Sequence, residues 1–162
     1  NKLLRQISRS VDKVGDEERA LMDDMLDTMY DAPGIGLAAI QIGVPKRIIV
    51  MDIGRDENKK EPRYFINPVI KNKNEEKAKY EEGCLSVPDQ FAEIERPNSC
   101  EVEYLDYNGK KQVLKADGLL ATCIQHEMDH LEGILFIDYL SKLKKSMIIK
   151  KLSKIKINRE IL

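Results

Sequence analysis

The sequence predicts an α+β fold in which mainly antiparallel strands pack around helices. Three observations predict it: an amphipathic stretch near the N-terminus, β-branched and alternating stretches in the middle, and two helical stretches towards the C-terminus. Elements grouped in this way usually pack as helices on an antiparallel sheet. The 162 residues fit one domain and can bury a core without disulfides. Because no repeat or low-complexity linker divides the chain, we expect residues 1–162 to form a single domain.

The first predicted element is an amphipathic helix over residues 15–30. Acidic side chains at 16–18 favour a helix N-terminus because they interact well with the helix dipole. Apolar residues then recur at three- and four-residue spacing: Leu21, Met22, Met25, Leu26 and Met29. Pro33 and Gly34 end the pattern, since neither continues a helix well.

The middle of the chain predicts strands. Residues 47–53 are β-branched and indicate a buried strand. Residues 64–70 indicate another, although Pro68 favours an edge position or a broken strand. Residues 77–115 predict mostly short strands, and the Asn-Gly pair at 108–109 predicts a two-residue hairpin turn.

Two helices are predicted after the strands. Asp117 is a candidate N-cap for a helix that runs to about Leu131 and ends near Gly133. The last helix is expected from Ser141 towards Ile157. Its apolar residues, expected to hold it to the body, are Leu143, Met147, Ile148, Leu152 and Ile155.

Composition excludes several classes of protein. The net charge of −1 predicts no general affinity for nucleic acid. No apolar run approaches the roughly 18 residues of a membrane span, and the N-terminus has no signal-peptide core. Three sparse cysteines indicate a reducing compartment. We therefore expect a cytoplasmic protein, or one of an organelle stroma or matrix, without a membrane partner.

The charge is nevertheless uneven. After residue 140 there is one acid, Glu160, and the basic residues are Lys142, Lys144, Lys145, Lys150, Lys151, Lys154, Lys156 and Arg159. A basic helix of this kind is either a solvated face or a surface that contacts phosphates.

The chain's two histidines indicate a metal site. His126 and His130 are four residues apart on a predicted helix, so both project from one face and can hold one ion. Imidazole suits zinc, iron, nickel or copper. Glu127 directly follows the first histidine and can act as a general base on a metal-bound water. The alternative is a solvated helix face with incidental histidines.

A catalytic metal usually has three protein ligands, so one is missing from this pair. Cys123 is an unsuitable third ligand, because a helical span of roughly 10 Å separates it from His130. The candidates elsewhere are Cys84, Cys100, Glu81 and Glu82. Strand parity favours a core position for Cys100, whereas Cys84 ends a glycine-containing strand and is better presented.

A third segment, residues 34–41, reads GIGLAAIQ. It lacks the last glycine of a dinucleotide-binding loop and the lysine of a P-loop, so it is a weak phosphate site. Its small residues are consistent with a helix-ending turn, or with close approach of the backbone to a ligand.

Together, GIGLAAIQ at 34–41, EGCLS at 82–86 and QHEMDH at 125–130 resemble the three motifs of the peptide deformylase family, in the same order. The resemblance covers essentially the whole chain. It implies an α+β fold around a central metal-binding helix. It also implies hydrolysis of the formyl group, released as formate, from N-formylmethionine on newly synthesised polypeptides.

The resemblance also implies site residues. The metal ligands would be Cys84, His126 and His130, and Glu127 would be the catalytic acid and base. The side-chain amide of Gln41 and the backbone N–H of Leu85 would stabilise the oxyanion. The peptide backbone would contact Ile35, Gly36 and Gly83, and the methionine pocket would comprise Tyr80, Leu119, Thr122 and Cys123.

The resemblance further implies iron(II) as the native metal, with zinc, nickel or cobalt as substitutes. We expect a monomer that acts on N-formylmethionyl nascent peptides and binds the ribosome through the basic C-terminal helix. Two departures stand out: residues that usually precede Asn1 are absent, and Phe91 replaces a basic residue of many relatives.

Two other functions compete with this interpretation. An HExxH endopeptidase needs a further ligand downstream, but no histidine follows His130 and Glu132 is too near. A ribosome- or RNA-binding module with a structural metal suits the basic helix, but such a site normally closes with a fourth cysteine or histidine.

Overall fold

The computed structural model describes residues 2–54 and 60–161, with the side chains of the last helix described as far as Lys154. Its strands are β1 (Gly36–Ala38), β2 (Ile48–Met51), β3 (Arg63–Lys73), β4 (Lys77–Cys84), β5 (Val87–Pro97), β6 (Ser99–Leu105) and β7 (Lys111–Asp117). Its helices are α1 (Asp16–Asp31), α2 (Gly118–Leu131) and α3 (Lys142–Ile161), with 3-10 turns η1 (Lys2–Arg5), η2 (Ala39–Ile42) and η3 (Phe136–Tyr139). The predicted α+β class is confirmed.

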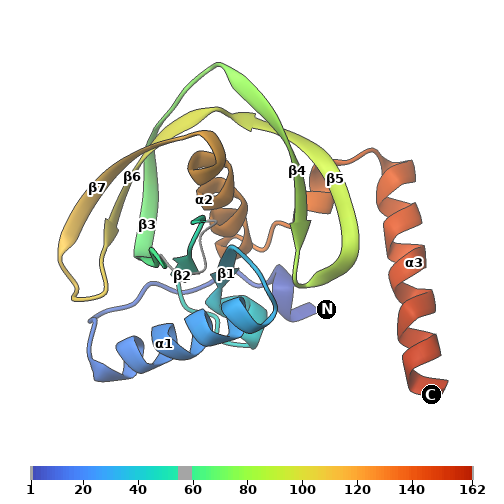
Figure 1. Ribbon diagram of the computed structural model, residues 1–162, viewed down its shortest axis with the longest axis horizontal. Coiled ribbons are helices and arrows are strands. Elements are labelled where there is room, and N and C mark those ends of the chain that lie inside the picture. The colour runs from blue at the N-terminus through green and yellow to red at the C-terminus, as the bar shows by residue number, and fades with distance from the viewer. Residues whose placement is uncertain (1, 55–59, 162) are drawn as a thin grey trace.

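The strands form two antiparallel sheets around one central helix. The larger sheet has the order β1-β2-β3-β6-β7, and β4 pairs with β5 in a separate hairpin. Figure 1 shows α2 in the space that the strands enclose, with α1 below it and α3 outside β5. The helix that carries both histidines is therefore surrounded by strands. No helix among the described residues is long and apolar enough to cross a membrane.

Buried methionines attach α1 to the larger sheet. Met22, Met25 and Met29 are fully buried in a cluster that includes Ile48 and Val50 of β2. Their spacing places them on one face of the helix, as the sequence pattern predicted. Complete burial of such a side chain contributes about 1.5–3 kcal/mol, so this face supplies much of the helix's attachment.

Pro68 lies in an irregular part of β3. The strand stands between β2 and β6 in the sheet order, but its pairing with β2 ends at Ile66. Among the described strands, residues 67–73 therefore have β6 alone as a neighbour, which is consistent with the predicted edge position. The predicted break is confirmed: the β3–β6 register shifts between Ile66 and Val69, and Asn67 adopts a positive φ of 50°. The bulge removes Pro68 from the regular ladder, where its missing N–H would leave an acceptor unpaired.

The hairpin between β6 and β7 is also wider than predicted. Leu105 pairs with Lys111, so five residues rather than two form the loop. The Asp106 carboxylate accepts hydrogen bonds from the backbone N–H groups of Asn108 and Lys110, and Gly109 has a φ of 80°. The aspartate thus stabilises a longer turn that the Asn-Gly pair alone does not specify.

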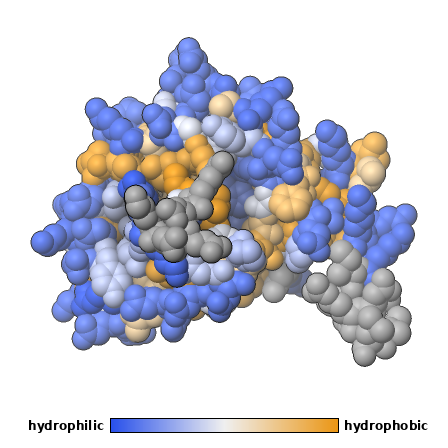
Figure 2. Space-filling model, in the orientation of Figure 1, coloured by the Kyte–Doolittle hydropathy of each residue, from blue (hydrophilic) through white to orange (hydrophobic). Residues whose placement is uncertain are grey.

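Only part of the predicted apolar face of α3 contacts the body. Ile148 is 8% exposed and packs beside Leu152, whereas Leu143 is 71% and Met147 is 51% exposed. The prediction that Leu143 and Met147 hold the helix to the body is therefore wrong, and the side chain of Ile155 lies outside the described residues. Successive helical residues are about 100° apart, so the two exposed residues face away from Ile148. Figure 2 shows apolar surface where α3 meets the body.

Asp138 joins three parts of the chain near that contact. Its carboxylate lies 2.5 Å from Arg5 of η1 and 2.8 Å from Lys145 of α3, and it accepts the backbone N–H of Leu135. Burial alone would raise the pKa of Asp138, but the hydrogen bonds from Arg5 and Lys145 outweigh it and lower the pKa. The ionised carboxylate therefore stabilises the folded state.

We predict that Asp138→Asn lowers the Tm at pH 7. A depressed folded-state pKa contributes stability above the unfolded value, near 4, and this contribution is lost as the pH falls towards the folded value. The Tm difference between the variant and the wild-type protein should therefore shrink between pH 5 and about 3. Thermal melts across this range test it, with Asp24→Asn on the exposed face of α1 as the matched control. A Tm loss that does not change with pH would contradict the role of the ionised carboxylate.

Candidate metal centre

Three candidate ligand groups from two elements meet beside α2. The ligand atoms of Cys84, His126 and His130 all lie within 4.8 Å of one another. The histidines are one turn apart on α2, and Cys84 ends β4 where the hairpin register shifts after Gly83. These are the three residues that the resemblance implied. They are the sole candidate group found among the described residues.

Buried hydrogen bonds orient the first histidine. The Nδ1 atom of His126 lies 2.9 Å from Glu82, and Arg96 donates two hydrogen bonds to the same carboxylate at 2.7 and 2.9 Å. Arg96 also donates to Asp129 at 2.8 Å, and Tyr139 donates to Asp129 at 2.7 Å. Since an ionised carboxylate only accepts, Nδ1 donates its N–H to Glu82, and once the ring is neutral Nε2 is the nitrogen with a free lone pair for a metal.

The sequence missed most of this support. It proposed Glu82 as a possible ligand, but the side chain instead accepts a hydrogen bond from a candidate ligand. Arg96 is not part of a recognisable motif. The alternation of buried and exposed residues along β5 places it on the inward face, and this alternation is the sequence feature that could have identified it. Glu81 is exposed, and Cys100 is buried in the core as strand parity favoured.

Before metal binding, the pKa values of the two imidazoles are shifted in opposite directions. Burial alone would lower the pKa of His126, but hydrogen bonds with Cys84 and Glu82 raise it to about 10. Burial lowers the pKa of His130 to about 3. A metal ion binds neutral imidazole and thiolate, so binding at this site must displace protons.

Glu127 lies beside the ligands but is not one of the group. One of its carboxylate oxygens is 3.9 Å from His126 Nε2, and the other is buried without a hydrogen-bond partner. Burial raises its pKa to about 7. A Cβ on Gly36 would lie 2.9 Å from this carboxylate and 3.0 Å from the sulfur of Cys123. Glycine at position 36 therefore leaves the room that Glu127 occupies.

The amide of Gln41 has a fixed orientation. Its oxygen accepts the backbone N–H of Ala38 at 2.9 Å. Its nitrogen donates to the sulfur of Cys84 at 3.3 Å and to the hydroxyl of Ser86 at 3.0 Å. An N–H donor is thus held against the candidate ligand set. The sequence did not single out Ser86.

A cleft of about 670 Å³ opens onto this centre. The residues of the predicted site that line this cleft are Ile35, Gly36, Gln41, Gly83, Cys84, Leu85 and Glu127. Four predicted pocket residues are not among its lining residues. Of these, Thr122 and Cys123 are buried on α2, Leu119 is half-buried, and the hydroxyl of Tyr80 lies near Gly118.

The residues present fit a divalent metal ion. One thiol and two imidazoles are a donor set that suits zinc, iron, nickel or cobalt. Three protein ligands are typical of catalytic rather than structural sites. The unpartnered carboxylate oxygen of Glu127 also fits, because it can accept a hydrogen bond from a water at such an ion.

Similarity to known proteins agrees with this geometry. The chain is 89% identical to a peptide deformylase of Pelagibacter ubique over 161 residues, covering 99% of this chain and 94% of the relative. It is 58% identical to a peptide deformylase of Rhizobium meliloti, covering 94% and 87%. A crystal structure of peptide deformylase from Ehrlichia chaffeensis superposes with a TM-score of 0.91 at 45% identity, covering 96% of this chain and 92% of that chain.

Neither the matches nor the candidate ligand group favours the two competing functions. The third member of the group is Cys84, which precedes the histidine pair in the chain. An endopeptidase site would instead take a ligand downstream of the pair, and the group contains none. The family model of polypeptide deformylase matches residues 1–146. The chain therefore belongs to the polypeptide deformylase family, a family of metalloenzymes, and its activity is the hydrolysis of the N-terminal formyl group of new polypeptides.

Proposed function

We propose that Cys84, His126 and His130 hold one catalytic divalent ion and that Glu127 moves the protons of deformylation. The meeting of a thiol, two imidazoles and an unpartnered buried carboxylate at the end of the cleft carries this proposal. When bound, the ion supplies Lewis acidity, which makes water a better nucleophile at neutral pH. The family resemblance supports iron(II) as the native metal, and the donor set also accepts zinc, nickel or cobalt.

Glu127 is placed to act twice. Its unpartnered oxygen accepts a proton from the attacking water as the water oxygen bonds to the formyl carbon. It then donates that proton to the departing amine nitrogen as the C–N bond breaks. The products are formate and a peptide with a free methionine amine. The carboxylate lies beside the candidate ligands, 3.9 Å from the Nε2 atom of His126.

Two hydrogen-bond donors stabilise the charge that develops on the formyl oxygen. The amide of Gln41 is held for this role by Ala38, so it need not reorient during the reaction. The backbone N–H of Leu85 is the second donor, on the cleft wall next to Cys84. Each such donor is worth on the order of 10²–10³ in rate.

The substrate lies along the same cleft. Ile35, Gly36 and Gly83 line it, which supports contacts with the peptide backbone. The family resemblance assigns the methionine side chain to Tyr80 of β4 and to Leu119, Thr122 and Cys123 of α2, which are not among the residues that line this cleft. The crowding of Gly36 against Glu127 favours a small acyl group such as formyl.

We predict that Glu127→Ala retains the metal but loses turnover. The carboxylate is not a ligand in this proposal, whereas general acid and base catalysis contributes about 10²–10⁴ in rate. Metal content after anaerobic purification and hydrolysis of formyl-Met-Ala-Ser should be measured on the same preparation. Equimolar iron with at most about a hundredth of wild-type activity is expected. Activity above about a tenth of wild type, or loss of the metal, would contradict this role.

We predict that Cys84 is alkylated in the metal-free protein and protected in the metal-loaded protein. Metal binding occupies the thiolate, which is otherwise half-buried at the cleft. Cys100 and Cys123 are internal controls, because burial raises the pKa of both thiols and leaves them less reactive. Mass mapping of the alkylated protein gives the result. Equal labelling of Cys84 in both forms would remove it from the ligand set.

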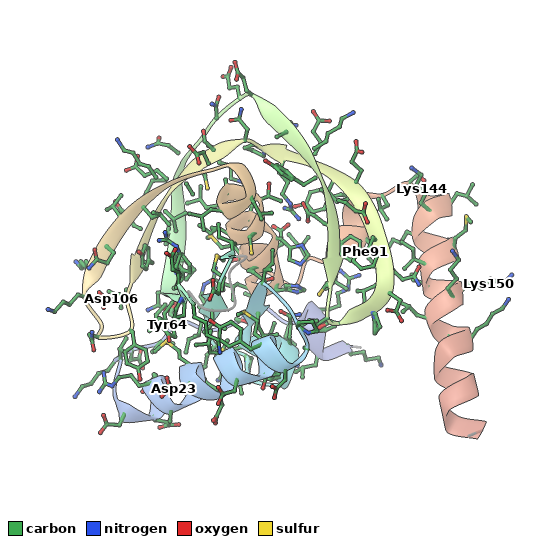
Figure 3. All side chains as sticks on the ribbon, viewed as in Figure 1. Asp23, Tyr64, Phe91, Asp106, Lys144 and Lys150 are labelled. Atoms are coloured by element: carbon green, nitrogen blue, oxygen red, sulfur yellow. The ribbon has the colours of Figure 1, made fainter. Side chains whose placement is uncertain are left out.

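The basic helix α3 offers a surface for a second binding partner. Lys150, Lys151 and Lys154 are exposed, and Figure 3 shows Lys150 extending away from the body. We propose that a monomer in the cytoplasm docks through this helix to ribosomal RNA, near emerging nascent chains. The free cysteines and the bacterial relatives support a reducing, cytoplasmic setting.

We predict that reversing Lys150, Lys151 and Lys154 to Glu weakens ribosome co-sedimentation at low salt. Phosphate contacts release counterions, so the wild-type interaction should also weaken as salt rises. Hydrolysis of a short formyl peptide should stay nearly unchanged, because these residues lie outside the cleft. Ribosome binding that survives all three reversals would leave α3 as a solvated face.

A further inference from the structure

The mouth of the cleft carries an exposed aromatic ring. Phe91 of β5 is 64% exposed, although it lines the same cleft as Cys84 and Glu127. Figure 3 labels it on β5, on the side of the molecule that carries α3. Ile35 and Leu85, on the same cleft, are also partly exposed. The reaction proposed above makes no use of this ring.

The position of the ring is set by a glycine. Phe91 pairs with Gly83 across the β4–β5 hairpin. A Cβ on Gly83 would lie 2.5 Å from two atoms of the ring, so the ring packs directly on the glycine backbone. The aromatic side chain is therefore held beside the strand that ends at Cys84, and much of its surface remains open to solvent.

The charges around the ring are negative. Glu81 and Asp89 line the cleft together with Phe91, and no lysine or arginine is among its lining residues. Neither carboxylate forms an ion pair within the part of the chain that the structure describes. The nearby Glu93 is 4.0 Å from Lys79, at the limit of an ion pair. A π face next to unpaired carboxylates is an environment that attracts a cation.

We propose that Phe91, Glu81 and Asp89 form a subsite for a lysine or arginine side chain shortly after the formyl-methionine. This inference rests on the proposed function, because it places the formyl group at Cys84. Neighbouring strands are about 5 Å apart, and an extended peptide advances about 3.3 Å per residue. A peptide with its formyl group at Cys84 therefore brings the residues after its methionine within reach of the ring. A cation over an exposed aromatic face corresponds to about a two- to fivefold gain in affinity.

The test compares kcat/KM for formyl-Met-Ala-X peptides in which X is Lys, Gln, Leu or Glu, with X also moved to the second and fourth positions. We expect Lys to exceed Gln by about two- to fivefold at one position, with Glu lowest. High salt should reduce the difference between Lys and Glu, since exposed charges are screened. Formyl-Met-Ala-Ser serves as the neutral reference.

Two substitutions give a matched comparison. Phe91→Arg should reverse the order of Lys and Glu. Val113→Arg makes the same charge change at a residue that is 58% exposed on β7, outside the cleft, and should keep the wild-type order. Phe91→Leu retains an apolar side chain without the π face and should reduce the preference for Lys.

Several results would overturn the subsite. These are equal kcat/KM for Lys, Gln and Glu at every position, a similar shift in Val113→Arg, or a preference for Leu over Lys that Phe91→Arg abolishes. The last would show an apolar subsite instead. In each case formyl-Met-Ala-Ser is still hydrolysed, so the deformylase assignment stands. Failure to hydrolyse any formyl peptide would overturn that assignment and this inference with it.

Discussion

The buried ion pair between Glu82 and Arg96 is the interaction on which the centre depends. Both side chains are buried, and they join the β4–β5 hairpin to α2 through His126 and Asp129. Burial works against the charge on each, yet the pKa of Arg96 is raised and that of Glu82 is lowered, so both stay ionised. Loss of either partner would leave the other buried charge only partly compensated, Arg96 by Asp129 or Glu82 by His126, and breaking a buried pair typically costs about 3–5 kcal/mol. The arrangement of the candidate ligands therefore depends on a correctly paired interior.

The hairpin could not hold Cys84 in place by itself. An isolated two-stranded sheet is marginally stable in water, and among the described strands β4 and β5 pair only with each other. Their attachment comes from the Glu82–Arg96 pair and from an apolar cluster in which Val87 and Ile94 pack with Phe136 and Ile148. This attachment brings the thiol at the end of β4 to the two histidines of α2.

Two glycines make room for side chains to which we assign roles. Gly36 leaves space on one wall of the cleft for the buried carboxylate of Glu127, whereas Gly83 leaves space at the mouth for the exposed ring of Phe91. At either position a methyl group would approach these side chains to within 3.0 Å. Gly36 thus accommodates the carboxylate that we propose as acid and base, and Gly83 accommodates the ring that we propose for peptide selection.

The sequence by itself determined the features that depend on local spacing. The periodicity of residues 15–30 predicted α1, and the four-residue spacing of His126 and His130 placed both on one face of α2. It left the third ligand open among several candidates until the motifs were compared with a known family. Only the tertiary structure decided that Glu82 supports His126 and that Leu143 and Met147 face solvent. The physical reason is that helical periodicity acts between near neighbours in the chain. Burial and ion pairing, in contrast, are decided by which distant segments fold against one another.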